Sequence, residues 1–119
     1  MAVKSITAWA DDTEQTVFSG AGRVHCIEVV PNDAQAAEVY LIFWDVANPN
    51  PATTAEKMVI PIGTLAIEGG PLRHKIKFSP GIRFTTACTV FMATAYAGET
   101  APTTTSLPQV TNIYYTVGN

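Results

Sequence analysis

The residues from Val39 to Trp44 are all apolar, and the carboxylate of Asp45 ends the run. A polar segment precedes the run, and a turn segment with two prolines follows it at residues 48–51. A continuous apolar run this short, rich in β-branched and aromatic residues, predicts a strand buried on both faces. The alternative is a short core helix, which the prolines disfavour because they follow too soon for a stable helix.

Between residues 72 and 78, neutral side chains alternate with Arg73, Lys75 and Lys77. This period of two predicts a strand whose three cations form a solvated face. A Ser-Pro-Gly sequence at residues 79–81 is expected to turn the chain before a strand resumes at residues 82–84.

Further apolar stretches predict strands at residues 3–9, 15–19, 23–30, 57–62, 87–96 and 110–117. The glycines at positions 20 and 22 suit a hairpin tip or a bulge, and Pro61 confines its strand to an edge or a strand end. No segment has the apolar spacing of an amphipathic helix over ten residues. The fold class expected is therefore all-β: an antiparallel β-sandwich, jelly-roll-like, with about eight strands. An immunoglobulin-like order remains open.

Composition indicates how such a domain is used. Hydrophobic residues make up 47% of the 119 residues and charged residues only 14%, against about 25% in typical soluble domains. A surface so short of charge favours an oligomer or a larger assembly over a free monomer. The length fits one folded unit whose core needs no metal or disulfide.

The end of the chain differs from the rest. Residues 98–108 are rich in Thr, Pro and Ala, which predicts an extended linker. We therefore expect a β-sandwich over residues 1–97 and an extended C-terminal arm with a final strand over residues 98–119. That strand either contacts a neighbouring subunit or shell, or adds to its own sandwich, because a free tail of this composition is a sheet-edge liability. The candidate assembly residues are Trp9, Val110, Ile113, Tyr114 and Tyr115.

The net charge of −3 gives the chain no attraction for nucleic acid or an anionic membrane. The first residues lack the apolar core of a signal peptide, and no apolar run approaches the ~18 residues of a membrane helix. Synthesis in a cytoplasm is therefore expected, with Cys26 and Cys88 as reduced thiols in apolar strands. A disulfide between them is the disfavoured alternative.

Groups for catalysis or metal binding are few and scattered. The two histidines and two cysteines lack the close ligand pairs of a structural zinc site: they are His25, Cys26, His74 and Cys88. Because neighbours on a strand point to opposite faces, His25 and Cys26 are not expected to reach one ion. The glycines at 20 and 22 precede no helix and make no phosphate cradle. We predict no enzyme activity, catalytic residue, metal or cofactor.

Four short motifs carry a family resemblance: Gly22-Arg23-Val24, the run from Val39 to Asp45, Ile60-Pro61-Ile62, and the sequence Phe-Ser-Pro-Gly-Ile-Arg-Phe from Phe78 to Phe84. In this order they resemble small β-sandwich structural proteins of tailed bacteriophages, the group of head decoration or cement proteins. The similarity covers residues 20–96. It implies a jelly-roll-like fold, assembly often as trimers, and a non-enzymatic structural role.

The expected function is that of a non-enzymatic virion protein, a phage capsid decoration or cement protein that stabilises the head. Its partners would be further copies of the chain, as a homo-oligomer and by resemblance a trimer, and the major capsid protein or another virion protein. It would be made in the host bacterial cytoplasm and reside in the virion. The alternative is a glycan- or ligand-binding β-sandwich, such as a receptor-binding or carbohydrate-binding domain, in which an exposed Trp9 or Trp44 stacks on a sugar. Trp44 is expected to close the core instead.

Overall fold

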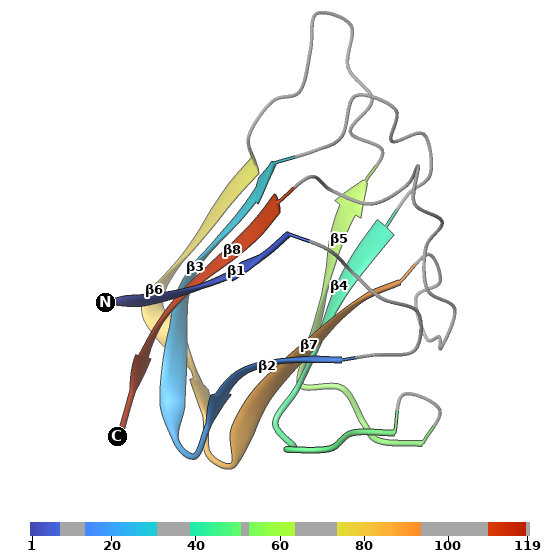
Figure 1. Cartoon of the computed structure of the whole chain (residues 1–119), viewed down its shortest axis with the longest axis vertical. Coiled ribbons are helices and arrows are strands. Elements are labelled where there is room, and N and C mark those ends of the chain that lie inside the picture. The colour runs from blue at the N-terminus through green and yellow to red at the C-terminus, as the bar shows by residue number, and fades with distance from the viewer. Residues whose placement is uncertain (8–13, 31–38, 51–52, 64–73, 94–109, 119) are drawn as a thin grey trace, which may run out of the picture.

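The computed structural model of the chain describes residues 1–7, 14–30, 39–50, 53–63, 74–93 and 110–118 (Figure 1). Its regular elements are the strands β1 (Ala2–Ile6), β2 (Gln15–Ser19), β3 (Gly22–Val30), β4 (Val39–Trp44), β5 (Met58–Gly63), β6 (His74–Phe84), β7 (Ala87–Ala93) and β8 (Val110–Val117). Within this part of the chain, no helix is long and apolar enough to span a membrane.

The strands form two four-stranded antiparallel sheets, which face each other in Figure 1: sheet 1 in the order β1-β8-β3-β6 and sheet 2 in the order β2-β7-β4-β5. The first strand pairs with the last, and the remaining strands pair in the same way toward the middle of the chain: β1 with β8, β2 with β7, β3 with β6, and β4 with β5. This long hairpin is wrapped so that β8 meets β3 and β7 meets β4. The arrangement is a jelly roll. It confirms the predicted all-β sandwich and excludes the immunoglobulin-like order.

Two local predictions are wrong. The turn after β2 is no hairpin within a sheet, because Gly20, with a φ of 80°, lies where the chain passes from sheet 2 to sheet 1. Residues 79–81 do not turn the chain, because β6 continues through them to Phe84. They are accommodated as a bulge, since the register of β6 against β3 shifts between Val24 and Cys26.

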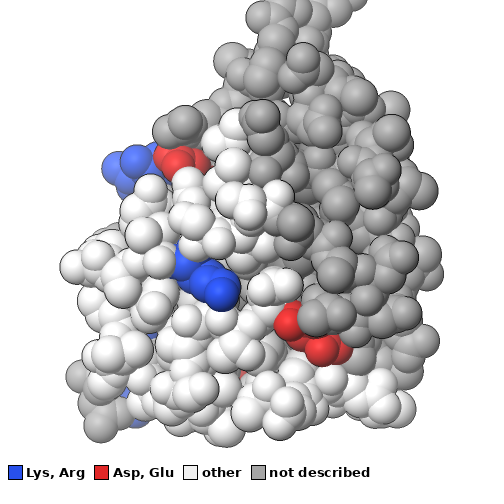
Figure 2. All heavy atoms as spheres, in the orientation of Figure 1, with Lys and Arg blue, Asp and Glu red and all other residues white. Residues whose placement is uncertain are grey.

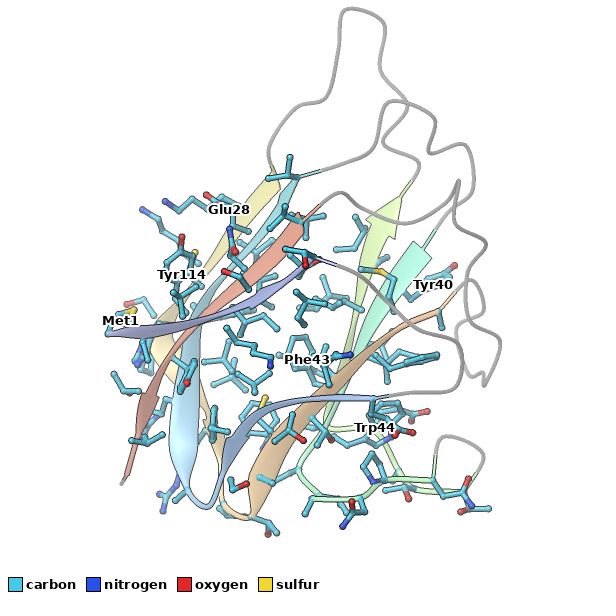
Figure 3. The ribbon with its side chains drawn as sticks, viewed as in Figure 1. Met1, Glu28, Tyr40, Phe43, Trp44 and Tyr114 are labelled. Atoms are coloured by element: carbon cyan, nitrogen blue, oxygen red, sulfur yellow. The ribbon has the colours of Figure 1, made fainter. Side chains whose placement is uncertain are left out.

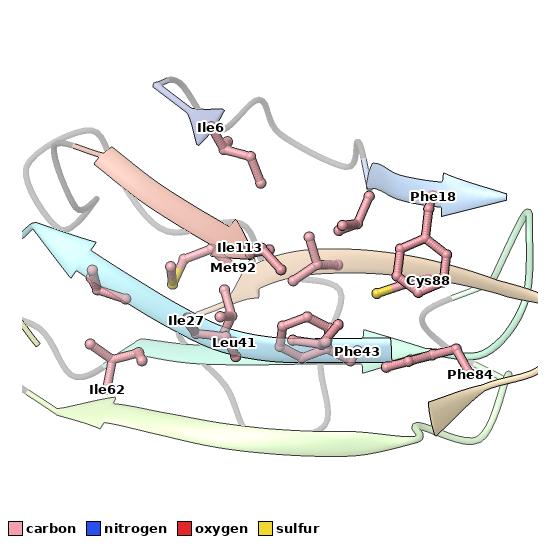
Figure 4. Close-up of a cluster of buried hydrophobic side chains, with 14 residues drawn as sticks. Ile6, Phe18, Ile27, Leu41, Phe43, Ile62, Phe84, Cys88, Met92 and Ile113 are labelled. Carbon is pink, nitrogen blue, oxygen red and sulfur yellow. The ribbon is translucent and has the colours of Figure 1, made fainter. Parts of the chain in front are cut away.

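The core lies between the two sheets (Figure 4). Alternate positions of each strand point into it, because successive side chains of a strand face opposite ways. Its members with no exposed surface include Val24, Ile27, Leu41, Phe43, Phe84, Met92 and Ile113. The ring of Phe18 meets Phe84 edge-on, with 5.9 Å between centroids, and stacks on Tyr115 at 5.2 Å. Burial of each large apolar side chain contributes about 1.5 to 3 kcal/mol.

β4 is buried on both faces, as its apolar run predicts. Leu41 and Phe43 point into the core between the sheets. Ile42 and Trp44 point the other way and join a second apolar cluster with Phe91. Figure 3 shows Trp44 on the side of sheet 2 that faces away from the core residue Phe43. The prediction that Trp44 is buried, and not exposed for stacking on a sugar, is thus confirmed: only 1% of this residue is exposed, and it packs in the second apolar cluster.

β8 is a central strand of sheet 1, paired with β1 on one side and with β3 on the other. Of the two explanations for residues 110–117, addition to the chain's own sandwich is the one observed. The expected division into a sandwich at 1–97 and an arm at 98–119 is therefore corrected, because the sandwich includes residues 110–117. The linker proposed at residues 98–108 lies outside the described part. Without β8, β1 would lose its partner strand and the core would lose Ile113.

Candidate functional site

Side chains of varied chemistry gather on the outer face of sheet 1. Directly opposed residues of antiparallel strands share a face, so the register places them in rows across the sheet. One row consists of Val3, Tyr114, Cys26 and Lys77, in the order β1, β8, β3, β6. The next row consists of Ser5, Asn112, Glu28 and Lys75. Figure 3 shows Tyr114 and Glu28 on the side of sheet 1 that faces away from the core residue Phe43.

A hollow of about 490 Å³ lies on this face beside the bulge. Between the pairs Val24–Ile82 and Cys26–Lys77, β3 contributes the single residue 25, whereas β6 contributes residues 78–81. The extra residues of β6 interrupt the ladder and leave space next to it. Four side chains give the hollow apolar surface: Met1, Cys26, Phe78 and Tyr114. Four more are polar: His25, Lys75, Lys77 and Ser79.

The bulge overturns one expectation about this region. His25 and Cys26 were expected on opposite faces, yet both line the hollow. Strict alternation holds only while the ladder keeps its register, and the register shifts at His25. The two side chains therefore meet the same space on the outer face of sheet 1.

The imidazole of His25 is held from two sides. Its Nε2 lies 2.8 Å from the hydroxyl oxygen of Thr116 on β8. On the other side the ring lies against Gly81, where a Cβ would come within 2.7 Å of Nδ1. Arg23 Nη1 donates a hydrogen bond of 3.0 Å to the carbonyl of Gly81. Glycine at position 81 thus leaves the room that the ring occupies, and this side of the hollow is preformed.

The polar row beside the hollow is a hydrogen-bonded network. Ser5 Oγ donates to Asn112 Oδ1 at 2.7 Å, and Asn112 Nδ2 donates to Glu28 Oε1 at 3.0 Å. Glu28 is only 6% exposed, and a buried carboxylate needs such donors. The bonds cross β1, β8 and β3. They therefore stiffen the sheet that carries the hollow.

Charge is sparse on the described surface, as the space-filling view in Figure 2 shows from one side. Against this background, Lys75 and Lys77 are both exposed at the hollow. Neither lysine forms an ion pair with a carboxylate of the described residues. The hollow is thus a locally cationic place on a chain whose net charge is −3.

Asp45, the carboxylate that ends the apolar run of β4, lies elsewhere and ties β4 to the β6–β7 turn. Oδ1 accepts hydrogen bonds from the backbone N–H groups of Thr86 at 2.7 Å and Ala87 at 3.1 Å. Oδ2 accepts from Thr85 N at 2.9 Å and Thr85 Oγ1 at 3.0 Å. Burial alone would raise the pKa of Asp45, but the donors of Thr85, Thr86 and Ala87 together hold it below its ordinary value. The carboxylate is a structural acceptor.

Among the described residues, no group of three or more His, Cys, Asp or Glu side chains could hold a metal ion. Cys26 and Cys88 are buried and unpaired, so the disulfide alternative does not apply. Burial, and after it the charge of Asp45, raises the pKa of the Cys88 thiol far above its ordinary value, which keeps it from acting as a thiolate. The side chain of His74 lies outside the described part.

The five predicted assembly residues lie in different surroundings. Trp9 lies outside the described residues. Ile113 has no exposed surface and packs in the core, so its contacts are within the sandwich. Tyr115 is half-buried and packs against the core from the same face of β8 as Ile113. Val110 is half-buried at the start of β8. Tyr114 is the one of the four described residues that lines the hollow.

Sequence reasoning missed the grouping of Tyr114 with His25, Cys26, Phe78 and Lys77. Strict alternation predicts His25 and Cys26 on opposite faces of the strand, and the Ser-Pro-Gly sequence predicts a turn. The signal that could have revealed the bulge was present, since Pro and Gly inside an otherwise regular strand mark edges and bulges. The apolar pattern that resumes at residues 82–84 fits one interrupted strand as well as two strands.

Comparison with known proteins found no similarity: no family model matches the chain, and no curated protein and no solved structure matches it. The assignment of function therefore depends on the jelly-roll topology and on the residues of the outer face of sheet 1.

Proposed function

We propose that this chain is a non-enzymatic structural protein of a virion, a capsid decoration or cement protein that binds copies of itself and a shell protein. The jelly roll supports this role, because viral capsid proteins use that architecture, although lectins and cupins share it. The four motifs that resemble phage decoration proteins fall in the consecutive strands β3, β4, β5 and β6. The low content of charged residues, 14%, supports a protein whose surface is covered by neighbours.

The observation that carries the proposal is the position of the exposed apolar side chains. Among the described residues, the large hydrophobic side chains left exposed are Met1 at 78%, Val3 at 49% and Val117 at 67%. Met1 and Val3 lie directly before and on β1, and Val3 is opposed to Tyr114 on the outer face of sheet 1, whereas Val117 follows the alternation of Ile113 and Tyr115 and points to the other face at the end of β8. Single exposed apolar residues are normal, but Met1 and Val3 beside Tyr114 favour an interaction surface on this outer face.

The sheet edges favour contacts through the faces of the sandwich over strand addition. Pro61 removes a backbone donor from the edge strand β5, and Pro80 does so within the bulge of β6. The edge strand β2 has a register shift between Thr16 and Phe18. On β1, Lys4 is opposed to the core residue Ile113 and so points inward. Prolines, bulges and inward charges are the features by which proteins block edge pairing.

The second candidate is a glycan- or ligand-binding module, which the hollow beside Tyr114 favours because aromatic side chains line many binding sites. The two functions predict different behaviour of the purified protein. A binding module recognises a defined ligand as a free chain, whereas a decoration protein is incorporated into particles.

The composition of purified particles tests the proposal. Virions are isolated from the cells in which the chain is made, and their proteins are quantified by mass spectrometry against the major capsid protein. We expect the chain in many copies per particle. Its absence from purified particles would contradict the proposal. Binding of the free chain to one class of glycan on an array, without incorporation into particles, would establish the second candidate instead.

A further inference from the structure

We propose that the hollow beside the β3–β6 bulge binds an acidic peptide segment of a neighbouring protein, in which carboxylates flank an apolar or aromatic side chain. The inference deepens the proposed function and rests on it for the identity of the neighbour. The recognition chemistry itself is a property of the free chain and is argued from the hollow's own residues.

The floor of the hollow suits an apolar side chain. Tyr114, Phe78 and Cys26 contribute carbon and sulfur surface from β8, β6 and β3. The volume of about 490 Å³ falls within the ~300–1,000 Å³ typical of ligand sites. A bound aromatic or aliphatic group would remove this surface from water, and that burial supplies the attraction.

The rim selects for negative charge. Lys75 and Lys77 are exposed at the hollow and form no ion pair with the described carboxylates. An ammonium group only donates hydrogen bonds, and a carboxylate only accepts them, so the two groups match. The chain carries a net charge of −3, so the two lysines, partly offset by Glu28 opposite Lys75, reduce the repulsion that an acidic partner meets at this hollow.

The hollow is also preorganised, which lowers the entropic cost of binding. His25 is fixed by the 2.8 Å contact with Thr116 and by its packing against Gly81. The network from Ser5 through Asn112 to Glu28 holds the three neighbouring strands beside it. A ligand therefore meets a formed site on rigid strands.

A peptide fits these features better than a sugar. Sugar hydroxyl groups need acceptors as well as donors, and among the described lining residues the side-chain acceptors are only the hydroxyl groups of Ser79 and Tyr114 and the ring of His25. The two lysines cannot accept a hydrogen bond, and no carboxylate or side-chain amide is among these residues. A carboxylated sugar therefore serves as the competing probe.

The test uses the full chain labelled with ¹⁵N and three small probes: 3-phenylpropionate, its neutral amide, and N-acetylneuraminate. The first carries the proposed chemistry in its simplest form, a carboxylate next to an aromatic ring. We expect it to shift the amide signals of Cys26, Lys77 and Tyr114 with a Kd of about 1 mM, as its size allows. The neutral amide should bind about fivefold more weakly, because it lacks the charge that the lysines attract.

Two matched variants give the residue-level test. Lys77→Glu reverses an exposed charge at the rim, and we expect it to weaken 3-phenylpropionate binding about fivefold. Arg83→Glu makes the same change of charge on an exposed residue of the same strand, outside the lining, and should alter binding by less than about twofold. Retention of the dispersed spectrum shows that each variant is folded.

Three outcomes would overturn the inference: shifts scattered over the surface or absent, equal binding of the carboxylate and its amide, or preferential binding of N-acetylneuraminate at the same residues. The last result would assign the hollow to a sugar. The virion experiment is independent of this one. A chain that is absent from particles but binds 3-phenylpropionate at Lys77 would contradict the proposed function and still support this inference.

Discussion

Asp45→Asn tests how the turn between β6 and β7 is held. The carboxylate accepts hydrogen bonds from the backbone N–H groups of Thr85, Thr86 and Ala87 and from the Thr85 hydroxyl. Asparagine has almost the same shape but keeps only one acceptor oxygen. Its NH₂ group would face backbone donors, so part of the network cannot form.

The size of the change in the free energy of unfolding depends on which of these donors water can reach. Hydrogen bonds to a charged group contribute about 1.5 to 3 kcal/mol each when they are shielded. Thr85 and Thr86 are exposed, so water replaces much of what they lose, whereas Ala87 is buried. We therefore expect the substitution to lower the free energy of unfolding by about 2 kcal/mol, well below the sum of the individual bonds. In a domain of this size the melting temperature then falls by about 6 to 10 °C.

The effect should depend on pH in one direction. Because the folded-state pKa of Asp45 is lowered, the unfolded chain takes up a proton at a higher pH than the folded chain. The stability from Asp45 is thus fully present above its ordinary pKa of 3.8 and is lost as the pH falls through the lower folded-state value. The difference in stability between the parent chain and Asp45→Asn should therefore shrink below about pH 4.

Urea unfolding followed by circular dichroism, at about pH 7 and at about pH 3, measures both effects. Glu56→Gln is the matched control, because Glu56 is an exposed carboxylate on a loop between β4 and β5. It should unfold like the parent chain. Equal losses in the two variants, or a loss in Asp45→Asn that stays constant down to about pH 3, would refute the role assigned to Asp45.

Three further substitutions or truncations test the packing. A chain that ends at residue 109 lacks the central strand β8 and should not fold, as circular dichroism would show; a folded product would contradict the placement of β8. Gly22→Ala should cost about 1 to 3 kcal/mol, because its Cβ would lie 2.6 Å from the Phe18 ring and 2.7 Å from the Thr116 carbonyl; unchanged urea unfolding would show that the strands have room to yield. Cys88→Ala should cost on the order of 1 kcal/mol through a small cavity, without loss of any oligomer. A loss of assembly in that variant would mean that Cys88 has a second role.

The strands themselves were largely predictable, because local pattern reports which faces of a strand are buried. The unbroken apolar run from Val39 to Trp44 predicts burial on both faces of the strand, and the alternation around Lys75 and Lys77 predicts one solvated face. Which sheet each strand joins is a different matter. β2 and β3 follow each other closely but lie in different sheets, and no local signal separates that from a hairpin.

The candidate site was predictable only through Tyr114. Its other members meet because four residues of β6 face one residue of β3, and register is a property of two strands that are distant in sequence. The same limit applies to β8, because its apolar composition predicts a buried strand but does not indicate which strands it pairs with. Asp45 was recognised as the end of a strand, but its donors come from residues 85–87, which only the fold brings next to it.

The central claim is that this jelly roll is an assembly protein, and its mass in solution tests that claim most directly. Multi-angle light scattering on the full chain at micromolar concentration gives the mass without reference to shape. The account predicts a defined oligomer, and by resemblance to decoration proteins a trimer with three times the chain mass of 12.7 kDa. A single species at 12.7 kDa that does not change with concentration would contradict self-assembly.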